Sequence, residues 1–248
     1  MKKFTYIISL SLLVLVSSCG ISEDCFKGNG NAITQSFPLE NFTKIKVYDG
    51  VGLVIKEGPN YEVLIKTSDN ILPNLEVNLE GEMLVVKDNS TCNIARDYGL
   101  TTVYVTSPNL TEIHSKTEQD IKSDGVLSYP SIALYSIDIS DGAGTGDFHL
   151  NLACDNIYIE SNNVSNFYLK GTCYNMHVFF SWGNGRFEGR DLVVNDISFY
   201  HRGSNDMIIH PINSLTGNIY ATGNVILKNE PNEPINVVQH FSGELIKN

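Results

Sequence analysis

Residues 147–178 decide the fold; they read DFHLNLACDNIYIESNNVSNFYLKGTCYNMHV and contain one pattern twice. Phe148-His149-Leu150 returns as Phe167-Tyr168-Leu169, and Ile157-Tyr158-Ile159 returns as Met176-His177-Val178. Each triplet sets one outward side chain between two inward apolar ones, which is the alternation of a half-buried strand. The stretch therefore predicts two short strands per repeat, joined alternately by a turn and by a return loop.

Both columns of triplets continue along the chain with one period. The first column begins at Phe148, Phe167, Phe187, Met207 and Val225, which are 19, 20, 20 and 18 residues apart. The second begins at Ile137, Ile157, Met176, Ile197 and Ile219, which are 20, 19, 21 and 22 residues apart. A repeat of this length is typical of a solenoid, in which stacked rungs bury an apolar face that a single rung leaves exposed.

Gly and Asn gather in the turns between the columns, where they tolerate the positive φ that a sharp corner needs. We therefore predict an all-β fold, with a right-handed parallel β-helix-like solenoid over residues 131–248 built from regular rungs of about 20 residues. An antiparallel sandwich is the alternative, but it has no reason to repeat side-chain type at a fixed interval.

Residues 31–130 form the more irregular β half of the same predicted domain, 31–248. Alternating apolar residues predict strands at 44–48, 52–56, 62–67, 75–79, 83–87, 101–106 and 111–114. Glu80-Gly81-Glu82 is a hairpin signal between two of them. We expect this half to be a meander that caps the solenoid, because an uncapped end exposes strand edges.

The N-terminus has the features of an export signal. Lys2 and Lys3 precede an apolar run that is too short to span a bilayer comfortably, and small residues then lead to Cys19. These features resemble a bacterial lipobox. They predict a signal peptide at 1–18, lipidation of Cys19 and a lipid-anchor linker at 19–30. The expected location is the cell envelope, as an outer-membrane lipoprotein that is periplasmic or surface-exposed, with the lipid as its membrane contact.

The charge balance excludes one class of partner. The chain has 17 basic and 28 acidic residues, a formal charge of −11. Loss of residues 1–18 removes two lysines and no acid, leaving 15 basic against 28 acidic residues and a charge of −13. A phosphate-backbone binder needs a basic surface, so no nucleic-acid partner is expected.

Four cysteines remain once Cys19 is lipidated, and they leave more than one pairing open. Cys154 and Cys173 occupy equivalent repeat positions, where they form either a disulfide between rungs or two unpaired thiols in the core. Cys25 and Cys92 lie in loop-like segments and are candidates to tie the N-terminus to the fold. No CxxC motif or Cys/His ligand spacing occurs, so no metal site is expected.

The sequence resembles a known family at several separate stretches: 42–47 (FTKIKV), 54–58 (VIKEG), 103–110 (VYVTSPNL), 223–231 (GNVILKNEP) and 242–245 (SGEL). The family is the putative auto-transporter adhesin, head GIN domain family, found in lipoproteins of some Gram-negative bacteria. Its Ser-Gly-Ser-Gly-Asp turns are kept well only at residues 141–147. The resemblance implies an all-β solenoid-like architecture, and it implies no established catalytic residues.

No catalytic constellation is present, so we expect no enzymatic activity and no cofactor. Asp138, Asp141 and Asp147 are the best local acidic group, and they would serve the alternative of a carbohydrate-active β-helix enzyme. Asp residues also cap turns by default, which is the interpretation we favour. The six histidines are scattered and form no HExxH motif.

Outward aromatic residues are the candidates for ligand contact: Tyr158, Tyr168, Trp182 and Tyr220. Aromatic side chains on a rigid sheet bind sugars or anchor a protein partner, although they also favour strands intrinsically. Tyr158 and Tyr220 are expected to share an outward column with His177. The leading hypothesis is a lipid-anchored envelope protein that binds a glycan or protein ligand; a structural envelope protein is a further alternative.

Overall fold

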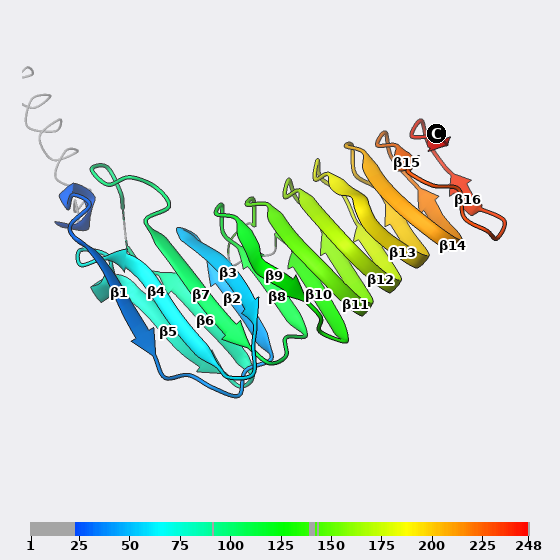
Figure 1. Cartoon of the computed structure of the whole chain (residues 1–248). Coiled ribbons are helices and arrows are strands. Elements are labelled where there is room, and N and C mark those ends of the chain that lie inside the picture. The colour runs from blue at the N-terminus through cyan, green and yellow to red at the C-terminus, as the bar shows by residue number, and fades with distance from the viewer. Residues whose placement is uncertain (1–22, 91, 139–141, 143, 248) are drawn as a thin grey trace, which may run out of the picture.

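The computed structural model describes residues 23–90, 92–138, 142 and 144–247. The chain forms an elongated β-solenoid of about six turns, whose rungs follow one another from the N-terminal to the C-terminal end (Figure 1). Cys19, the predicted signal peptide and Asp141 lie outside the described residues. Among the described residues, no helix is long and apolar enough to cross a membrane.

Short elements build the N-terminal half. They are η1 (Glu23–Phe26), β1 (Ala32–Phe37), β2 (Lys44–Tyr48), β3 (Val51–Glu57), β4 (Glu62–Ser68), η2 (Leu72–Asn74), β5 (Leu75–Glu80), β6 (Met83–Asp88), β7 (Thr101–Ser107), β8 (Glu112–Lys116), β9 (Ile121–Leu127) and β10 (Ser131–Ser136). Long strands and a short closing rung build the other half: β11 (Phe148–Ser161), β12 (Phe167–Phe180), β13 (Phe187–His201), β14 (Met207–Ile219), β15 (Val225–Leu227), β16 (Asn236–Gln239) and β17 (Leu245–Lys247).

The pairing divides the strands between two faces with the core between them. The first face follows the order β5-β6-β2-β8-β10-β11-β12-β13-β14-β16. The second face follows β1-β4-β7-β3-β9-β11-β12-β13-β14-β15-β17. Strands β11–β14 belong to both faces, because each bends from the second face into the first.

The first predicted column is confirmed, and the second is correct only in its middle. Phe148, Phe167, Phe187, Met207 and Val225 are register partners from rung to rung. In the second column the partner of Ile157 is Ile132 instead of Ile137, and the partner of Ile197 is Leu215 instead of Ile219. Neighbouring apolar residues fit a fixed period equally well, so the period alone cannot identify the partner when rungs differ in length.

The expected return loop at residues 151–156 is also wrong. In β11 this segment continues as strand, and its partner segment in β12 does the same. Each long rung is thus one bent strand of 13 to 15 residues followed by one Gly/Asn-rich turn. Stacked neighbours satisfy the backbone hydrogen bonds through the bend, so no loop is required there.

The strands predicted for the N-terminal half exist, and β5 and β6 form the predicted antiparallel hairpin. The half is not a separate meander. Strands β2 and β3 pair in parallel with β6, β8, β7 and β9, so they form irregular rungs of the same solenoid. The antiparallel strands β1, β4 and β5 lie at the N-terminal end of the two faces and cover it (Figure 1).

A column of buried rings fills the core between the faces. Phe148 and Phe167 are fully buried and stack with ring centroids 4.7 Å apart and planes 10° apart. Phe180 packs on Phe167 at 5.7 Å. The rungs repeat their inward side chains because equivalent positions face the same column, and this packing is the main stabilising contribution to a stacked fold.

Two of the four described cysteines form a disulfide, and the other two are free thiols. Cys25 and Cys92 form a disulfide with a Cα–Cα distance of 4.8 Å, which ties η1 to the segment before β7. Cys154 and Cys173 are register partners but remain free and buried, so the unpaired alternative holds. Burial raises the pKa of Cys154 to about 11 and that of Cys173 to about 12. Both are therefore inert thiols at neutral pH.

Candidate functional site

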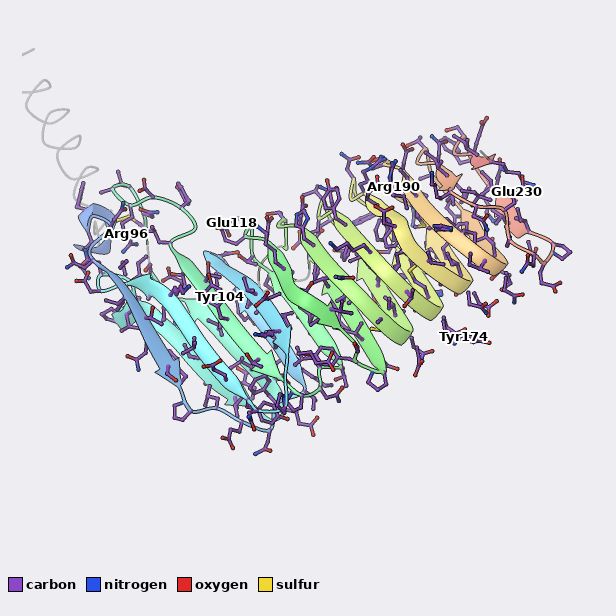
Figure 2. The ribbon with its side chains drawn as sticks, in the orientation of Figure 1. Arg96, Tyr104, Glu118, Tyr174, Arg190 and Glu230 are labelled. Carbon is purple, nitrogen blue, oxygen red and sulfur yellow. A yellow bond between two sulfur atoms is a disulfide. The ribbon has the colours of Figure 1, made fainter. Side chains whose placement is uncertain are left out.

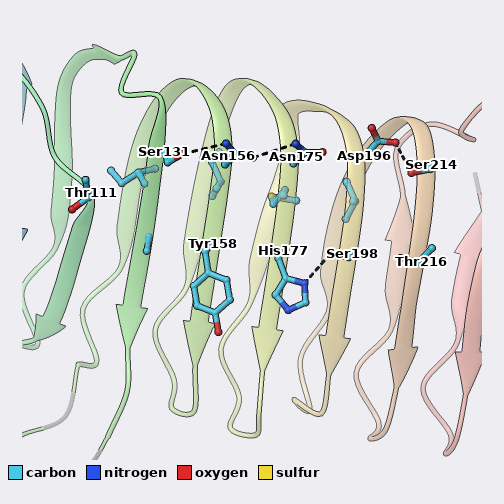
Figure 3. A pocket seen from close by; sticks show the side chains of 15 residues that line it. Thr111, Ser131, Asn156, Tyr158, Asn175, His177, Asp196, Ser198, Ser214 and Thr216 are labelled. Atoms are coloured by element: carbon cyan, nitrogen blue, oxygen red, sulfur yellow. Dashed lines mark hydrogen bonds between the residues drawn. The ribbon is translucent and has the colours of Figure 1, made fainter.

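A shallow groove of about 430 Å³ crosses the first face from the β8–β10 edge to β14 (Figure 3). Two rows of outward side chains line it, and each row takes one residue from each successive strand. The amide row is Ser131, Asn156, Asn175, Asp196 and Ser214. The ring row is Ala133, Tyr158, His177, Ser198 and Thr216.

Hydrogen bonds between rungs hold the amide row in line. Asn175 Nδ2 donates to Asn156 Oδ1 at 3.1 Å, and Asn156 Nδ2 donates to Ser131 Oγ at 3.1 Å. Both asparagines are exposed. An amide NH₂ has two hydrogens, so each keeps one donor for a ligand after these bonds are formed.

The two large members of the ring row lie side by side. The rings of Tyr158 and His177 have centroids 5.6 Å apart and planes only 9° apart. Figure 3 shows the flat of both rings turned toward the viewer, over the outer surface of the sheet. Tyr158 and His177 therefore form one aromatic platform, flanked by the small residues Ala133 and Ser198.

A hydrogen bond holds each ring of the platform in place. The Tyr158 hydroxyl donates to Glu160 Oε2 at 2.9 Å, and His177 Nδ1 lies 2.7 Å from Ser198 Oγ. Burial raises the pKa of Tyr158, and the Glu160 carboxylate raises it further. Burial lowers the pKa of His177. Both rings are therefore uncharged at neutral pH.

Asp196 is the one carboxylate among the residues that line the groove, and it is poorly suited to proton transfer. Hydrogen bonds from Ser214 and Asn213 lower its pKa. Asn213 Nδ2 donates to Asp196 Oδ1 at 2.9 Å, and Asn195 Nδ2 donates to Oδ2 at 2.5 Å. An ionised, fully hydrogen-bonded carboxylate is a positioned acceptor and lacks the proton that a general acid needs.

A second aromatic ladder runs beside the groove on the first face. Phe179, Tyr200, Tyr220 and His240 follow one another with centroids 4.8, 4.7 and 4.1 Å apart. The first two pairs are tilted, with ring planes 30° and 33° apart, and Tyr220 and His240 stack with planes 4° apart. Each ring of this ladder therefore has another ring beside it along the solenoid axis.

The four predicted contact aromatics do not form one surface. Tyr158 belongs to the platform, whereas Tyr220 lies in the second ladder; the expected column shared by Tyr220 and His177 is wrong, because the register partner of Ser198 on β14 is Thr216. Tyr168 lies on the second face, stacked on His149 at 4.8 Å. Trp182 is exposed in the turn after β12.

His177, the second ring of the platform, is not among the aromatic residues that the sequence predicts for ligand contact, although the repeat places it one rung from Tyr158. The register column carries the signal, because two rings on adjacent rungs at equivalent outward positions must contact each other.

The second face has a more strongly charged surface. Tyr104 and Arg190 lie on it (Figure 2), and Lys66 Nζ sits 4.4 Å from the Tyr104 ring centroid. Arg190 Nε contacts Glu188 at 2.6 Å. A groove of about 460 Å³ there is lined by charged side chains of both signs, including Lys170, Glu188 and Arg190.

Asp147 is the member of the predicted acidic group whose side chain makes hydrogen bonds in the described structure. Asp147 Oδ1 accepts hydrogen bonds from Asn166 N at 2.9 Å and from Asn166 Nδ2 at 3.0 Å, which link one rung to the next. Asp147 also lies with Asp120 and His149 in a group whose ligand atoms are within 4.8 Å. Lys122 Nζ neutralises Asp120 at 3.0 Å. The geometry favours the interpretation of Asp147 as a turn residue.

The comparisons with known proteins agree with this architecture. Residues 41–231 match the model of the family described as putative auto-transporter adhesin, head GIN domain. No functionally curated protein shows significant sequence similarity to the chain.

Several solved structures share the fold. A putative adhesin from Bacteroides fragilis is 19% identical with a TM-score of 0.80, over 89% of this chain and 99% of that one. A putative adhesin from Parabacteroides distasonis is 14% identical with a TM-score of 0.66, over 90% and 99% of the two chains. A putative lipid binding protein from the same species is 15% identical with a TM-score of 0.63, over 89% and 98%. At these identities the likeness shows the fold alone, whereas the family match covers most of the sequence, and the chain belongs to the putative auto-transporter adhesin, head GIN domain family.

Proposed function

We propose that this chain is a non-catalytic binding or adhesion protein of the bacterial cell envelope, and that the groove on the first face is its binding surface. One observation carries the proposal: a row of polar side chains centred on Asn156 and Asn175 shares one rigid sheet face with a hydrogen-bonded aromatic platform. Rigid placement reduces the entropy lost when a ligand binds. The adhesin family to which the chain belongs supports a binding role.

The enzymatic alternative has less support. The groove carboxylate Asp196 has a lowered pKa, and Asp147 is engaged by the next rung. Glycoside hydrolysis requires a protonated carboxyl group facing a second carboxylate across the substrate. The described carboxylates of the groove do not supply that pair.

The proposed anchor is a lipid on Cys19, following removal of residues 1–18. The test is metabolic labelling with radioactive palmitate and fractionation of cells that express the full chain or its Cys19→Ala variant. We expect label and membrane association for the natural chain and neither for the variant. Equal membrane association of both would contradict lipid anchoring.

The proposed binding surface is tested on cells that display the full chain. Binding of these cells to immobilised glycans and glycoproteins is compared with that of a Tyr158→Ala/His177→Ala double variant. Tyr168→Ala is the matched control, because it removes a stacked aromatic from the second face. Loss of binding only in the double variant supports the groove; binding that is equal in all three chains argues against it.

A further inference from the structure

The groove on the first face repeats along the solenoid axis, and this repetition suits a repeating ligand. Its lining residues come from successive strands between β10 and β14, with Thr111 at the near edge. Strands in a sheet are about 4.8 Å apart, so the groove runs for roughly 20 Å at a right angle to the strands. Each rung along that line offers one side chain of the amide row and one side chain of the ring row. A folded protein partner has no such repeat, whereas a linear polymer does.

The platform has the chemistry of a sugar-stacking surface. A β-linked pyranose carries its hydroxyls around the rim and presents C–H groups on its flat sides, which pack against the electron-rich face of an aromatic ring. Tyr158 and His177 offer two nearly parallel rings with centroids 5.6 Å apart, both turned outward in Figure 3. Successive sugars of an extended β-linked chain advance by a similar distance, so adjacent sugars can sit on adjacent rings.

The amide row stands where the hydroxyls of such a chain would lie. Asn156 and Asn175 are register partners that lie two positions before Tyr158 and His177 on β11 and β12. Their bonds to each other and to Ser131 orient them and leave one amide hydrogen each. Amide groups that lie in a row at fixed spacing donate to equivalent hydroxyls on successive sugars.

The charges around the groove select against acidic ligands. No lysine or arginine is among its lining residues, and Asp196 lies in it. Glu160 lies beside it, held by the Tyr158 hydroxyl. A carboxylate or sulfate on the ligand would meet these groups without a cation to offset the repulsion.

We propose that the groove binds an unbranched, neutral, β-linked glycan that runs along the solenoid axis, with adjacent sugars stacked on Tyr158 and His177 and hydroxyls bound by Asn156 and Asn175. This inference rests on the proposed binding function and names its ligand class.

The test is isothermal titration calorimetry of the full chain, purified in detergent, with hexasaccharides in matched pairs. Cellohexaose and maltohexaose contain the same sugar, but the first has β linkages and is extended, whereas the second has α linkages and is helical. Mannohexaose and hexamannuronate share a β-1,4-linked backbone, but each sugar of hexamannuronate carries a carboxylate. We expect binding of at least one of the two neutral β-linked probes, and weaker binding of its matched partner by about tenfold or more, a loss of about 1.4 kcal/mol or more.

Three platform variants and one control variant connect the binding to the platform. Tyr158→Ala and His177→Ala should each weaken the neutral β-linked probe by about tenfold, given the contribution of one stacked ring. Tyr158→Phe should retain most of the binding, because it keeps the ring and loses only the bond to Glu160. Tyr168→Ala, on the second face, should leave binding unchanged. Circular dichroism of each variant checks that the fold is intact.

Several results would overturn the inference: no heat with either neutral probe at millimolar concentration, preference for hexamannuronate, or equal binding by Tyr158→Ala and the natural chain. If cells still adhere through Tyr158 and His177 to a glycoprotein while both neutral probes fail, the ligand class is wrong and the groove remains the binding surface. If adhesion does not depend on the two residues either, the proposed function itself fails.

Discussion

The tight turns between rungs allow a direct test of what the glycines contribute to the solenoid. Gly183 has φ +100°, and a Cβ built on it would lie 2.1 Å from the carbonyl oxygen of Asn163 on the preceding rung. Gly125 has a similar φ of +95°, but a Cβ there would meet no atom within 4 Å. Substituting alanine at both positions therefore separates the cost of the backbone conformation from the cost of rung contact.

The expected destabilisation follows from the contacts at each position. Positive φ costs a non-glycine residue about 1–2 kcal/mol, and both variants bear this cost. At Gly183 the added methyl also forces the two rungs apart by about 1 Å, since a carbon–oxygen contact needs about 3.3 Å. That movement stretches the two backbone hydrogen bonds that join these rungs, from Asn184 N and from Gly185 N to Asn163 O, both at 3.1 Å. At about 1 kcal/mol each, Gly183→Ala should cost about 2 kcal/mol more than Gly125→Ala.

Guanidinium unfolding monitored by circular dichroism measures both losses, with the slope of the transition checked for equality between variants. A lower midpoint for Gly183→Ala at an unchanged slope is the expected result. Equal midpoints for the two variants would refute the reasoning, because the glycine would then serve the φ angle and not the close approach of rungs. A changed slope would show that the rungs no longer unfold together, and the comparison would move to amide hydrogen exchange at β12 and β13.

Other changes test the core, the buried histidine and the disulfide. Phe167→Ala should cost about 3–5 kcal/mol because Phe167 is fully buried, and the adjacent Tyr168→Ala should cost less than about 1 kcal/mol, as measured by the same unfolding assay. Burial lowers the pKa of His201, so below about pH 6.5 the unfolded chain binds a proton that the folded chain excludes. Stability should therefore be complete above that pH and decline as pH falls below it, and His201→Leu should flatten the decline between pH 7 and pH 5; an unchanged slope would contradict this. Reduction of the Cys25–Cys92 disulfide, which spans 67 residues, should lower stability by up to about 4 kcal/mol, and Cys25→Ser should make the protein insensitive to dithiothreitol.

The repeat period of about 20 residues predicted that the rungs stack. It predicted the register between rungs less well, because the rungs differ in length. Phe148 and Phe167 each follow a Gly/Asn-rich turn and begin a strand directly, so their alignment needs no knowledge of the loops. Ile137 is not the partner of Ile157, because β10 ends at Ser136 and the sequence has more residues between β10 and β11 than between β11 and β12. A fixed period does not show in which part of a rung such additional residues fall.

The binding groove could be located only in part from the sequence, because ring orientation is a tertiary property. Alternation shows that Tyr158 and Tyr200 both point outward, and nothing local distinguishes them. Their surroundings differ across rungs. Tyr200 lies between Phe179 and Tyr220, whose rings are tilted against it by 30° and 33°, so it has a ring on either side along the axis.

The platform has small residues at both of its ends in the ring row. Ala133 is the register partner of Tyr158 on one side, and Ser198 is the register partner of His177 on the other. The Tyr135 ring is the neighbour of Tyr158 from outside the row, and it is tilted by 53° with centroids 5.9 Å apart, so it does not stack on Tyr158. The bonds to Glu160 and Ser198 hold the two platform rings in place. Ala133→Tyr would therefore place a ring beside Tyr158 in this row and weaken any ligand that binds the flat faces, without removing a single contact residue.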